Sequence, residues 1–221
     1  MKFTIITAFF LFILLSACNN ESLCIKGDGQ IVEFDLSLDD FTKISLSGPI
    51  DLKIIQSDTP SLKIQAERQL MDVLAYQVRN NELEIGFERN IRCLNSSKGV
   101  LVVATISDLS QIRTDGSSDI FSEGNINLDE LIINSHGEAN VELSGFVANQ
   151  VLVGDGKLDV RNFNLLTNLT EIEISGLGHF DINCSSELTI DVNGAATVNY
   201  KGTPSISQKV NGSLDLNNAN D

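Results

Sequence analysis

The chain has 221 residues, enough for one sizeable domain, and hydrophobic residues make up 42% of it. Its 30 acidic residues outnumber 15 basic ones, which gives a formal net charge of −15 at pH 7. This balance excludes a nucleic-acid partner, because phosphate backbones repel an acidic surface. It fits a solvated acidic surface or a cationic partner.

The N-terminus has the features of an export signal. After Lys2, the run from Phe3 to Leu15 is apolar, has the length of a signal-peptide core and is too short to span a bilayer. The sequence Leu-Ser-Ala-Cys that ends at Cys18 resembles the lipobox of bacterial lipoproteins. We therefore predict a lipoprotein signal peptide over residues 1–17. The alternative is plain secretion with an incidental cysteine.

Lipidation of Cys18 would make the membrane a partner of this protein through acyl chains such as palmitate. Residues 18–23 then form the lipidated cysteine and a short polar tether. We expect an outer-membrane lipoprotein of the cell envelope. The sequence leaves open whether it faces the periplasm or the outside.

Three further cysteines follow in a chain that we expect to be exported to an oxidising compartment, namely Cys24, Cys93 and Cys184. Because their number is odd, at most one disulfide can form within the chain. We favour Cys24–Cys93, which would tie the start of the fold to a later loop. None of the three has the spacing of a metal site.

Residues 24–106 are rich in short segments whose apolar and polar residues alternate, as in half-buried strands. The predicted strands span residues 31–38, 44–54, 62–66 and 83–87. A hairpin turn is predicted at residues 79–82. The one plausible helix covers residues 69–75.

Six glycines organise residues 107–216: Gly116, Gly137, Gly156, Gly176, Gly194 and Gly212. Successive members are 21, 19, 20, 18 and 18 residues apart, and the positions two and four residues away on either side are mostly apolar or small. A constant period of this kind, filled with strand-like alternation, predicts stacked coils of a parallel β-helix with about 20 residues per coil. The expected fold is therefore all-β, with a more irregular strand-rich part before the regular coils.

Each glycine is expected at an inward corner, where a Cβ would collide or φ must be positive. Gly48 has the same apolar neighbours, so the scheme extends into the first half of the chain. Residues 24–216 then form a single domain, and residues 217–221 form a tail.

The outward positions of the coils hold the candidate ligand contacts. Three residues after their glycines, Asp159 and His179 would be neighbours in successive coils. A carboxylate beside an imidazole suits acid–base chemistry or a glycan or Ca²⁺ contact. The alternative is that outward columns are polar simply because they face water.

The remaining sequence offers no catalytic constellation. It lacks a serine nucleophile elbow, a His/Cys metal cluster and a phosphate-binding loop. We therefore predict no catalytic residue, no metal site and no cofactor.

Several segments carry a resemblance to a known family: Ser47–Ile54, Leu83–Ile85 and, above all, Val192–Ile206. On these segments the chain resembles the putative auto-transporter adhesin head GIN domain family over about residues 24–215. The resemblance implies a right-handed β-helix, a cell-envelope location and a domain of unknown function for which no catalytic residues can be transferred.

The functional prediction is a cell-envelope lipoprotein whose rigid polar surface binds a glycan or a surface protein without catalysis. One alternative is a glycan-active enzyme on a β-helix scaffold. Another is a structural envelope component or homo-oligomer, for which Phe121, Phe146 and Leu177 would supply apolar contacts.

Overall fold

The computed structural model describes residues 24–88, 91 and 93–220. The predicted signal peptide, the predicted lipidation site Cys18 and the tether up to residue 23 lie outside these residues. The described chain is all-β apart from one short helix, which confirms the predicted fold class at that level. No helix among the described residues is long and apolar enough to cross a membrane.

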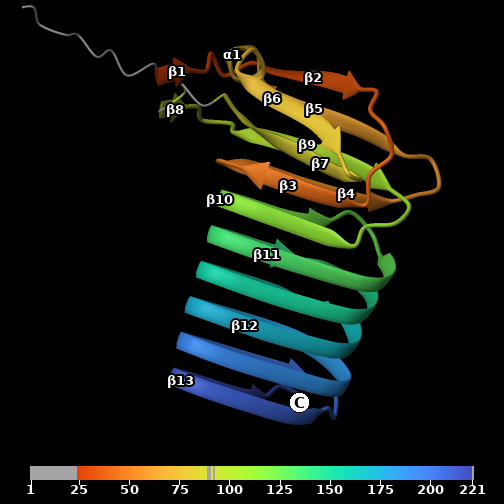
Figure 1. Cartoon of the computed structure of the whole chain (residues 1–221), viewed down its shortest axis with the longest axis vertical. Coiled ribbons are helices and arrows are strands. Elements are labelled where there is room, and N and C mark those ends of the chain that lie inside the picture. The colour runs from red at the N-terminus through yellow and green to blue at the C-terminus, as the bar shows by residue number, and fades with distance from the viewer. Residues whose placement is uncertain (1–23, 89–90, 92, 221) are drawn as a thin grey trace, which may run out of the picture.

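The elements fall into an N-terminal group of short strands and a C-terminal group of long ones (Figure 1). The first group is β1 (Cys24–Lys26), β2 (Ile31–Leu36), β3 (Lys43–Ser47), β4 (Ile50–Gln56), β5 (Ser61–Glu67), α1 (Arg68–Met71), β6 (Leu74–Arg79), β7 (Glu82–Phe87), β8 (Cys93–Asn95) and β9 (Val100–Ile106). The second is β10 (Gln111–Ser122), β11 (Ile126–Glu142), β12 (Gly145–Lys201) and β13 (Ser205–Asn218).

Strands β10 to β13 lie on one another in parallel, and we call them the stack (Figure 1). The register follows the glycines: Gly116 is paired with Gly137, Gly137 with Gly156, and Gly194 with Gly212. Each layer of the stack is thus one glycine repeat, and the parallel pairing of equivalent residues agrees with the sequence period.

The N-terminal strands continue this arrangement upward. Strands β3 and β4 pair in parallel with β10, so that Ile44 lies beside Ile112 and Leu52 beside Ile120. Strand β9 is parallel to β4, whereas β5 and β2 follow in antiparallel order. The irregularity predicted for this half is therefore a change from parallel layers to antiparallel strands.

The core is a column of aliphatic side chains inside the layers. From Gly48 to Gly194, the residues four positions before and after each glycine of the series are buried and alternate with more exposed ones. They are Ile44, Leu52, Ile112, Ile120, Ile133, Val141, Leu152, Val160, Ile172, Phe180, Ile190 and Val198. Each such side chain contributes roughly 1.5–3 kcal/mol of transfer free energy, which makes this column the main driving force of the fold.

The glycine corners differ from the prediction in one respect. The glycines are not buried inward residues, since Gly137 and Gly156 are exposed. Their φ angles are positive, and a Cβ on any of them would overlap the carbonyl oxygen of the glycine one layer earlier. Gly116 meets Gly48 in this way, which confirms that Gly48 belongs to the series.

The predicted hairpin turn is confirmed, because Asn80 and Asn81 both have positive φ between β6 and β7. The predicted helix is shorter than expected: α1 ends at Met71, and Leu74 already begins β6. The buried side chain of Leu70 holds this single helical turn against the core.

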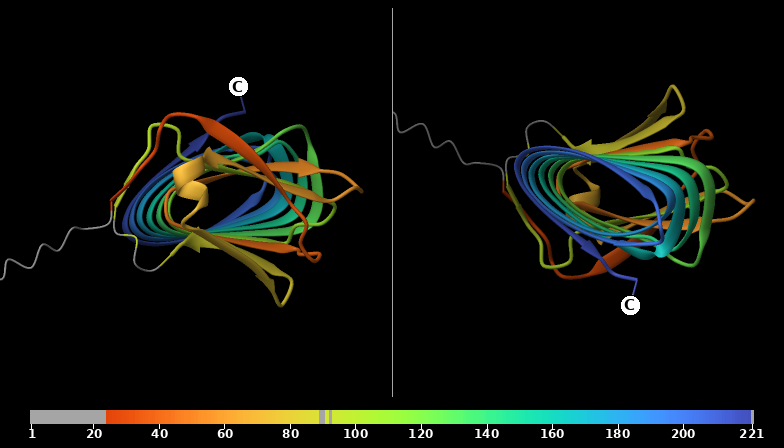
Figure 2. Two further views of the ribbon diagram at one scale, coloured as in Figure 1. Left: turned by 90° about the horizontal axis from the view of Figure 1, so that it is seen from above. Right: turned by 90° about the horizontal axis from the view of Figure 1, so that it is seen from below.

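The two ends of the ring of layers differ in whether an element covers them. Seen from above in Figure 2, α1 lies over the upper mouth of the ring that the layers form. Seen from below, none of the described elements lies across the lower mouth, and β13 is the last layer. The side chains of β13 are accordingly exposed or only half-buried.

Candidate functional site

One outward surface of the stack collects polar side chains that follow the glycine corners. We call it the post-glycine face and define it by the residues one, three and five positions after each glycine. Its central column, at the third position, is Asp51, Asp119, Asn140, Asp159, His179, Thr197 and Asp215. Strand alternation explains the column, because these residues point away from the buried positions on either side.

The upper part of this column is a hydrogen-bonded ladder. The Asn140 side-chain amide donates to the Asp119 carboxylate at 2.7 Å. The Asp119 backbone N–H in turn donates to Asp51 Oδ1 at 2.9 Å. Partial burial raises the pKa of the Asp51 carboxyl above its usual value; the Asp119 hydrogen bond opposes this rise and the Asp119 charge adds to it.

Ion pairs link the columns in the middle of the face. Arg161 donates two hydrogen bonds to Asp159, at 3.2 Å from Nε and 3.0 Å from the terminal nitrogen. This bidentate contact raises the pKa of the Arg161 guanidinium. Lys157 forms a similar pair with Glu138 in the layer above, and the pKa of its ammonium is raised for the same reason.

Asp159 and His179 both line one hollow of about 310 Å³ on this face. Each side chain, however, has a different partner: Asp159 pairs with Arg161, and His179 Nε2 lies 3.3 Å from Asp181 Oδ1. The same Asp181 oxygen accepts a hydrogen bond from Asn199 at 2.8 Å. The two predicted ligand contacts therefore share a depression without forming a dyad with each other.

The hollow combines an apolar patch with a polar rim. Leu177 is 60% exposed, and Gly178, Ala195 and Ala196 beside it add no polar side chain. Around them lie the lysine, carboxylates, hydroxyls and imidazole of Lys157, Asp159, His179, Thr197, Ser213 and Asp215. An apolar floor with directed polar groups suits a ligand that has one flat apolar side and several hydroxyl or amide groups.

A second hollow of about 350 Å³ adjoins the first. It is lined by residues of three successive layers, and Asp159 and Arg161 belong to its wall. Because Asp159 lines both hollows, the two form a continuous concave stretch along the stack. The post-glycine face can thus contact a ligand longer than one layer.

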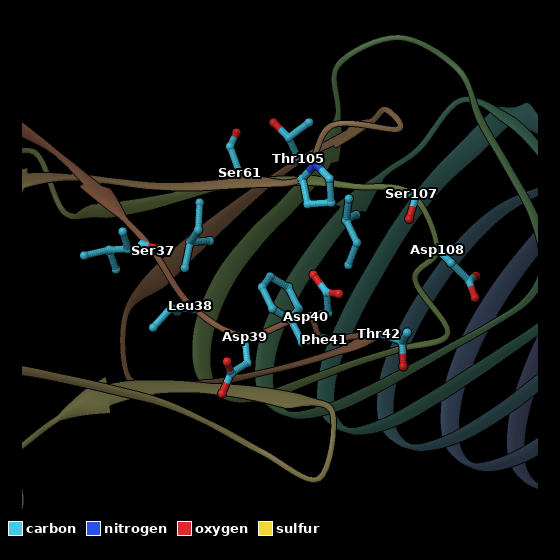
Figure 3. A pocket seen from close by; sticks show the side chains of 14 residues that line it. Ser37, Leu38, Asp39, Asp40, Phe41, Thr42, Ser61, Thr105, Ser107 and Asp108 are labelled. Atoms are coloured by element: carbon cyan, nitrogen blue, oxygen red, sulfur yellow. The ribbon is translucent and has the colours of Figure 1, made fainter.

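Another hollow lies elsewhere, between the N-terminal strands (Figure 3). Its volume is about 470 Å³, and three stretches meet there: Leu36–Thr42, Pro60–Leu62 and Thr105–Asp108. Phe41 is one of its lining residues, and three carboxylates also line it, those of Asp39, Asp40 and Asp108 (Figure 3). Its chemistry suits an apolar group that carries a positive charge.

The structure joins Cys24 to Cys93 by a disulfide, and the two residues are directly opposite in the parallel pair β1–β8. A buried carboxylate reinforces this junction, because Glu67 accepts hydrogen bonds from the Gly29 backbone and the Ser96 hydroxyl. Cys184 is a free, buried thiol whose Sγ lies 3.0 Å from the Glu187 carbonyl oxygen.

Within residues 24–88, 91 and 93–220, no three His, Cys, Asp or Glu side chains are placed to hold a metal ion. The contacts that the structure shows in the upper part of the acidic column are the hydrogen bonds that link Asp51, Asp119 and Asn140.

The sequence interpretation missed the partners Arg161, Asp181 and Asn199. All three lie five residues after their glycines, so the same numbering would have placed them in a second polar column. No pattern in the sequence predicts the hollow of Figure 3, because the three stretches that line it are far apart in the chain.

Comparison with known proteins places this geometry in context. A family model described as putative auto-transporter adhesin, head GIN domain matches residues 40–204. The crystal structure of a putative adhesin from Bacteroides fragilis NCTC 9343 has a TM-score of 0.67 and 20% identity, over 87% of this chain and 99% of that one. A putative adhesin from Parabacteroides merdae ATCC 43184 has a TM-score of 0.66 and 20% identity, over 88% and 98%. At this identity the similarity concerns the fold alone. No curated protein matches the chain.

Proposed function

Because this chain belongs to the putative auto-transporter adhesin, head GIN domain family, we propose that it is a non-catalytic adhesion domain of the cell envelope. It binds a glycan or a surface protein through the post-glycine face. The observation that carries this proposal is the concave stretch around Leu177, which joins an exposed apolar patch to hydrogen-bonding groups from successive layers.

The scaffold of this adhesion domain is a right-handed parallel β-helix of about 20 residues per coil. Parallel pairing of residues one glycine repeat apart supports this description. So does the glycine corner that recurs in every layer. Such a scaffold is stiff, so little conformational entropy is lost when a partner binds its surface.

The ion pairs around the hollow support binding by the same reasoning. The Asp159–Arg161 and His179–Asp181 pairs fix the side chains around the hollow before a ligand arrives. Groups held in place in this way lose less rotamer freedom on contact than free surface side chains do. The exposed Leu177 lies among them, and burial of its apolar surface by a ligand would favour binding.

The domain is attached to the outer membrane through a lipid on Cys18, after removal of residues 1–17. The sequence of the export signal supports this anchor. Cys18 precedes the Cys24–Cys93 disulfide by six residues, so the anchor would hold the molecule by its upper end. The Cys18→Ser variant should then leave the membrane fraction and lose palmitate labelling.

A binding screen of the purified full chain against glycans and matrix proteins tests the adhesion function. For a ligand found in this way, we expect Asp159→Ala and His179→Ala each to weaken binding about tenfold, the loss of roughly one hydrogen bond to a charged group. The matched control is Glu173→Ala, which removes an exposed carboxylate from the opposite side of the Gly176 corner.

Three results bear on the proposal in different ways. If all three variants bind alike, the post-glycine face is not the binding surface. If no member of a broad panel binds, the adhesion function itself fails. Cleavage of a polysaccharide by the chain would instead favour a glycan-active enzyme, with the His179–Asp181 pair as its acid–base group.

A further inference from the structure

The last layer of the stack has one unpaired edge. Strand β13 pairs with β12 along one side, and no described strand pairs with its other side. Its inward apolar residues are consequently uncovered: Ile206 is 37% and Val210 43% exposed. An open edge of this length is a template for another strand.

The sequence of β13 is self-complementary about Gly212. Lys209 and Asp215, its two charged residues, lie three positions before and after this glycine. The inward residues Val210 and Leu214 lie two positions before and after it. An antiparallel pair of β13 strands centred on Gly212 would therefore place Lys209 opposite Asp215 and Val210 opposite Leu214, each twice.

The glycine corner makes this pairing geometrically possible. The chain bends at Gly212, where φ is +143°. A two-fold axis through the corner places the part of β13 before Gly212 in one copy against the part after Gly212 in the other. Both copies then bend at the same point. The Cβ direction of Gly212 points back toward Gly194, which leaves only backbone on the side that would meet a second copy.

We propose that a second copy of this chain docks on the β13 edge, tail to tail and antiparallel, with Gly212 at the two-fold axis. The two open ends then cover each other, and the apolar side chains of the last layers become interior. Lys209 already pairs with Asp191 at 2.7 Å and is 81% exposed, so it can also contact a carboxylate below it.

This arrangement would extend the hollow on the post-glycine face. Ser213 and Asp215 form its lower wall and lie on β13. In the dimer, the partner's Lys209 would face Asp215 across the axis. The second copy would thus contribute a cationic group to the rim of the hollow.

The free edge at β2, another end of the same sheet, is poorly suited to this pairing. Strand β2 ends the sheet at the top, and its outward residues Glu33 and Asp35 are both acidic. Two such edges around a two-fold axis would set like charges opposite each other. Charge complementarity therefore favours β13 over β2.

Cysteine cross-linking of the full chain in its membrane tests the register. Two differently tagged copies are co-expressed, one with Asn211→Cys and the other with Ser213→Cys, which the proposed pairing makes directly opposite. After mild oxidation we expect a disulfide between the two tags on a non-reducing gel. The matched control is Asn193→Cys with Ala195→Cys, the same positions one layer earlier, which would lie about 14 Å apart (three layer spacings) and should not cross-link.

Charge reversal tests the charge complementarity of the two β13 strands. Lys209→Glu should lower the cross-linked fraction about tenfold, since two opposite-charge pairs become two like-charge pairs. The double variant Lys209→Glu with Asp215→Lys should restore it. Equal cross-linking of both cysteine pairs, absence of the 211–213 product, or failure of the double variant to recover would each overturn the proposal. Ligand binding by Asp159 variants is measured separately, so loss of the dimer and loss of the adhesion function are distinguishable.

Discussion

At the scale of single residues, the glycine corners allow the layers to approach to the normal spacing of hydrogen-bonded strands. At Gly116 the φ angle is +141°, and a Cβ would lie 2.6 Å from the Gly48 carbonyl oxygen. The neighbour is backbone of a paired strand and cannot move aside alone. Two separate costs therefore apply to any other residue: an unfavourable φ and a steric overlap between layers.

We expect Gly116→Ala to lower the free energy of unfolding by about 2–5 kcal/mol, from backbone strain and overlap together. The control is Gly124→Ala, where φ is +82° but no atom lies within 4 Å of the added Cβ. This variant should lose only about 1–2 kcal/mol, the cost of the backbone conformation alone. Urea denaturation of both variants measures the difference, and equal losses would contradict the steric role of the stack.

A second residue-scale prediction concerns Asp51, whose pKa is raised chiefly by burial. A carboxyl with a folded pKa above its unfolded value binds its proton more tightly in the folded state, so stability falls as pH rises from 3.8 through the raised pKa. Asp51→Asn keeps an oxygen that can accept from Asp119 and removes this cost. It should stabilise the protein near pH 7 by at most about 1 kcal/mol, because the group is half-exposed. The gain should disappear below about pH 3.8 in urea titrations; a gain that persists there would point to another cause.

At the scale of elements, the disulfide holds two short strands that have little else to stabilise them. Strands β1 and β8 have three residues each and form a separate two-stranded sheet. The bond between Cys24 and Cys93 closes a loop with a sequence separation of 69 residues. Long closed loops restrict the unfolded chain most, which is the main source of stabilisation in the chain-entropy model.

We expect the double variant Cys24→Ser with Cys93→Ser to lose about 2–5 kcal/mol of stability relative to the oxidised protein. Reductant should lower the denaturation midpoint of the natural sequence to that of the double variant and leave the double variant unchanged. Cys184 serves as an internal reference, since it is free and buried in both proteins. A midpoint that does not respond to reductant would show that β1 and β8 are held by other contacts.

At the scale of the whole molecule, the net charge of −15 opposes compaction. The ion pairs of the described residues lie on the surface, where each contributes little to the free energy of unfolding, so salt that screens them lowers stability only slightly. The main effect of salt on stability should therefore be to screen the repulsion among the excess acidic groups. We expect a rise from about 10 mM to 150 mM NaCl to increase stability by about 1 kcal/mol, or about 2–4 °C in melting temperature at this size. A melting temperature that falls with salt would mean that the ion pairs outweigh the net charge.

The sequence by itself determined the features that depend on local patterns. Alternation of apolar and polar residues identifies strands, since successive side chains of a strand point to opposite sides. The glycine period identified the layers and placed Gly48 among them, and the Asn80–Asn81 pair identified the hairpin turn. The family could also be recognised, because its characteristic segments are continuous in the chain.

Only the tertiary structure decided which side chains meet. Numbering from the glycines predicted that Asp159 and His179 are neighbours in successive layers. In the structure, however, Asp159 pairs with Arg161 and His179 pairs with Asp181. The glycines looked like inward corners, yet the atom that excludes a Cβ belongs to the glycine of the preceding layer. The hollow of Figure 3 joins three separate stretches and left no local pattern. Periodicity fixes the direction in which a side chain points, whereas its partner depends on chain segments brought beside it by folding.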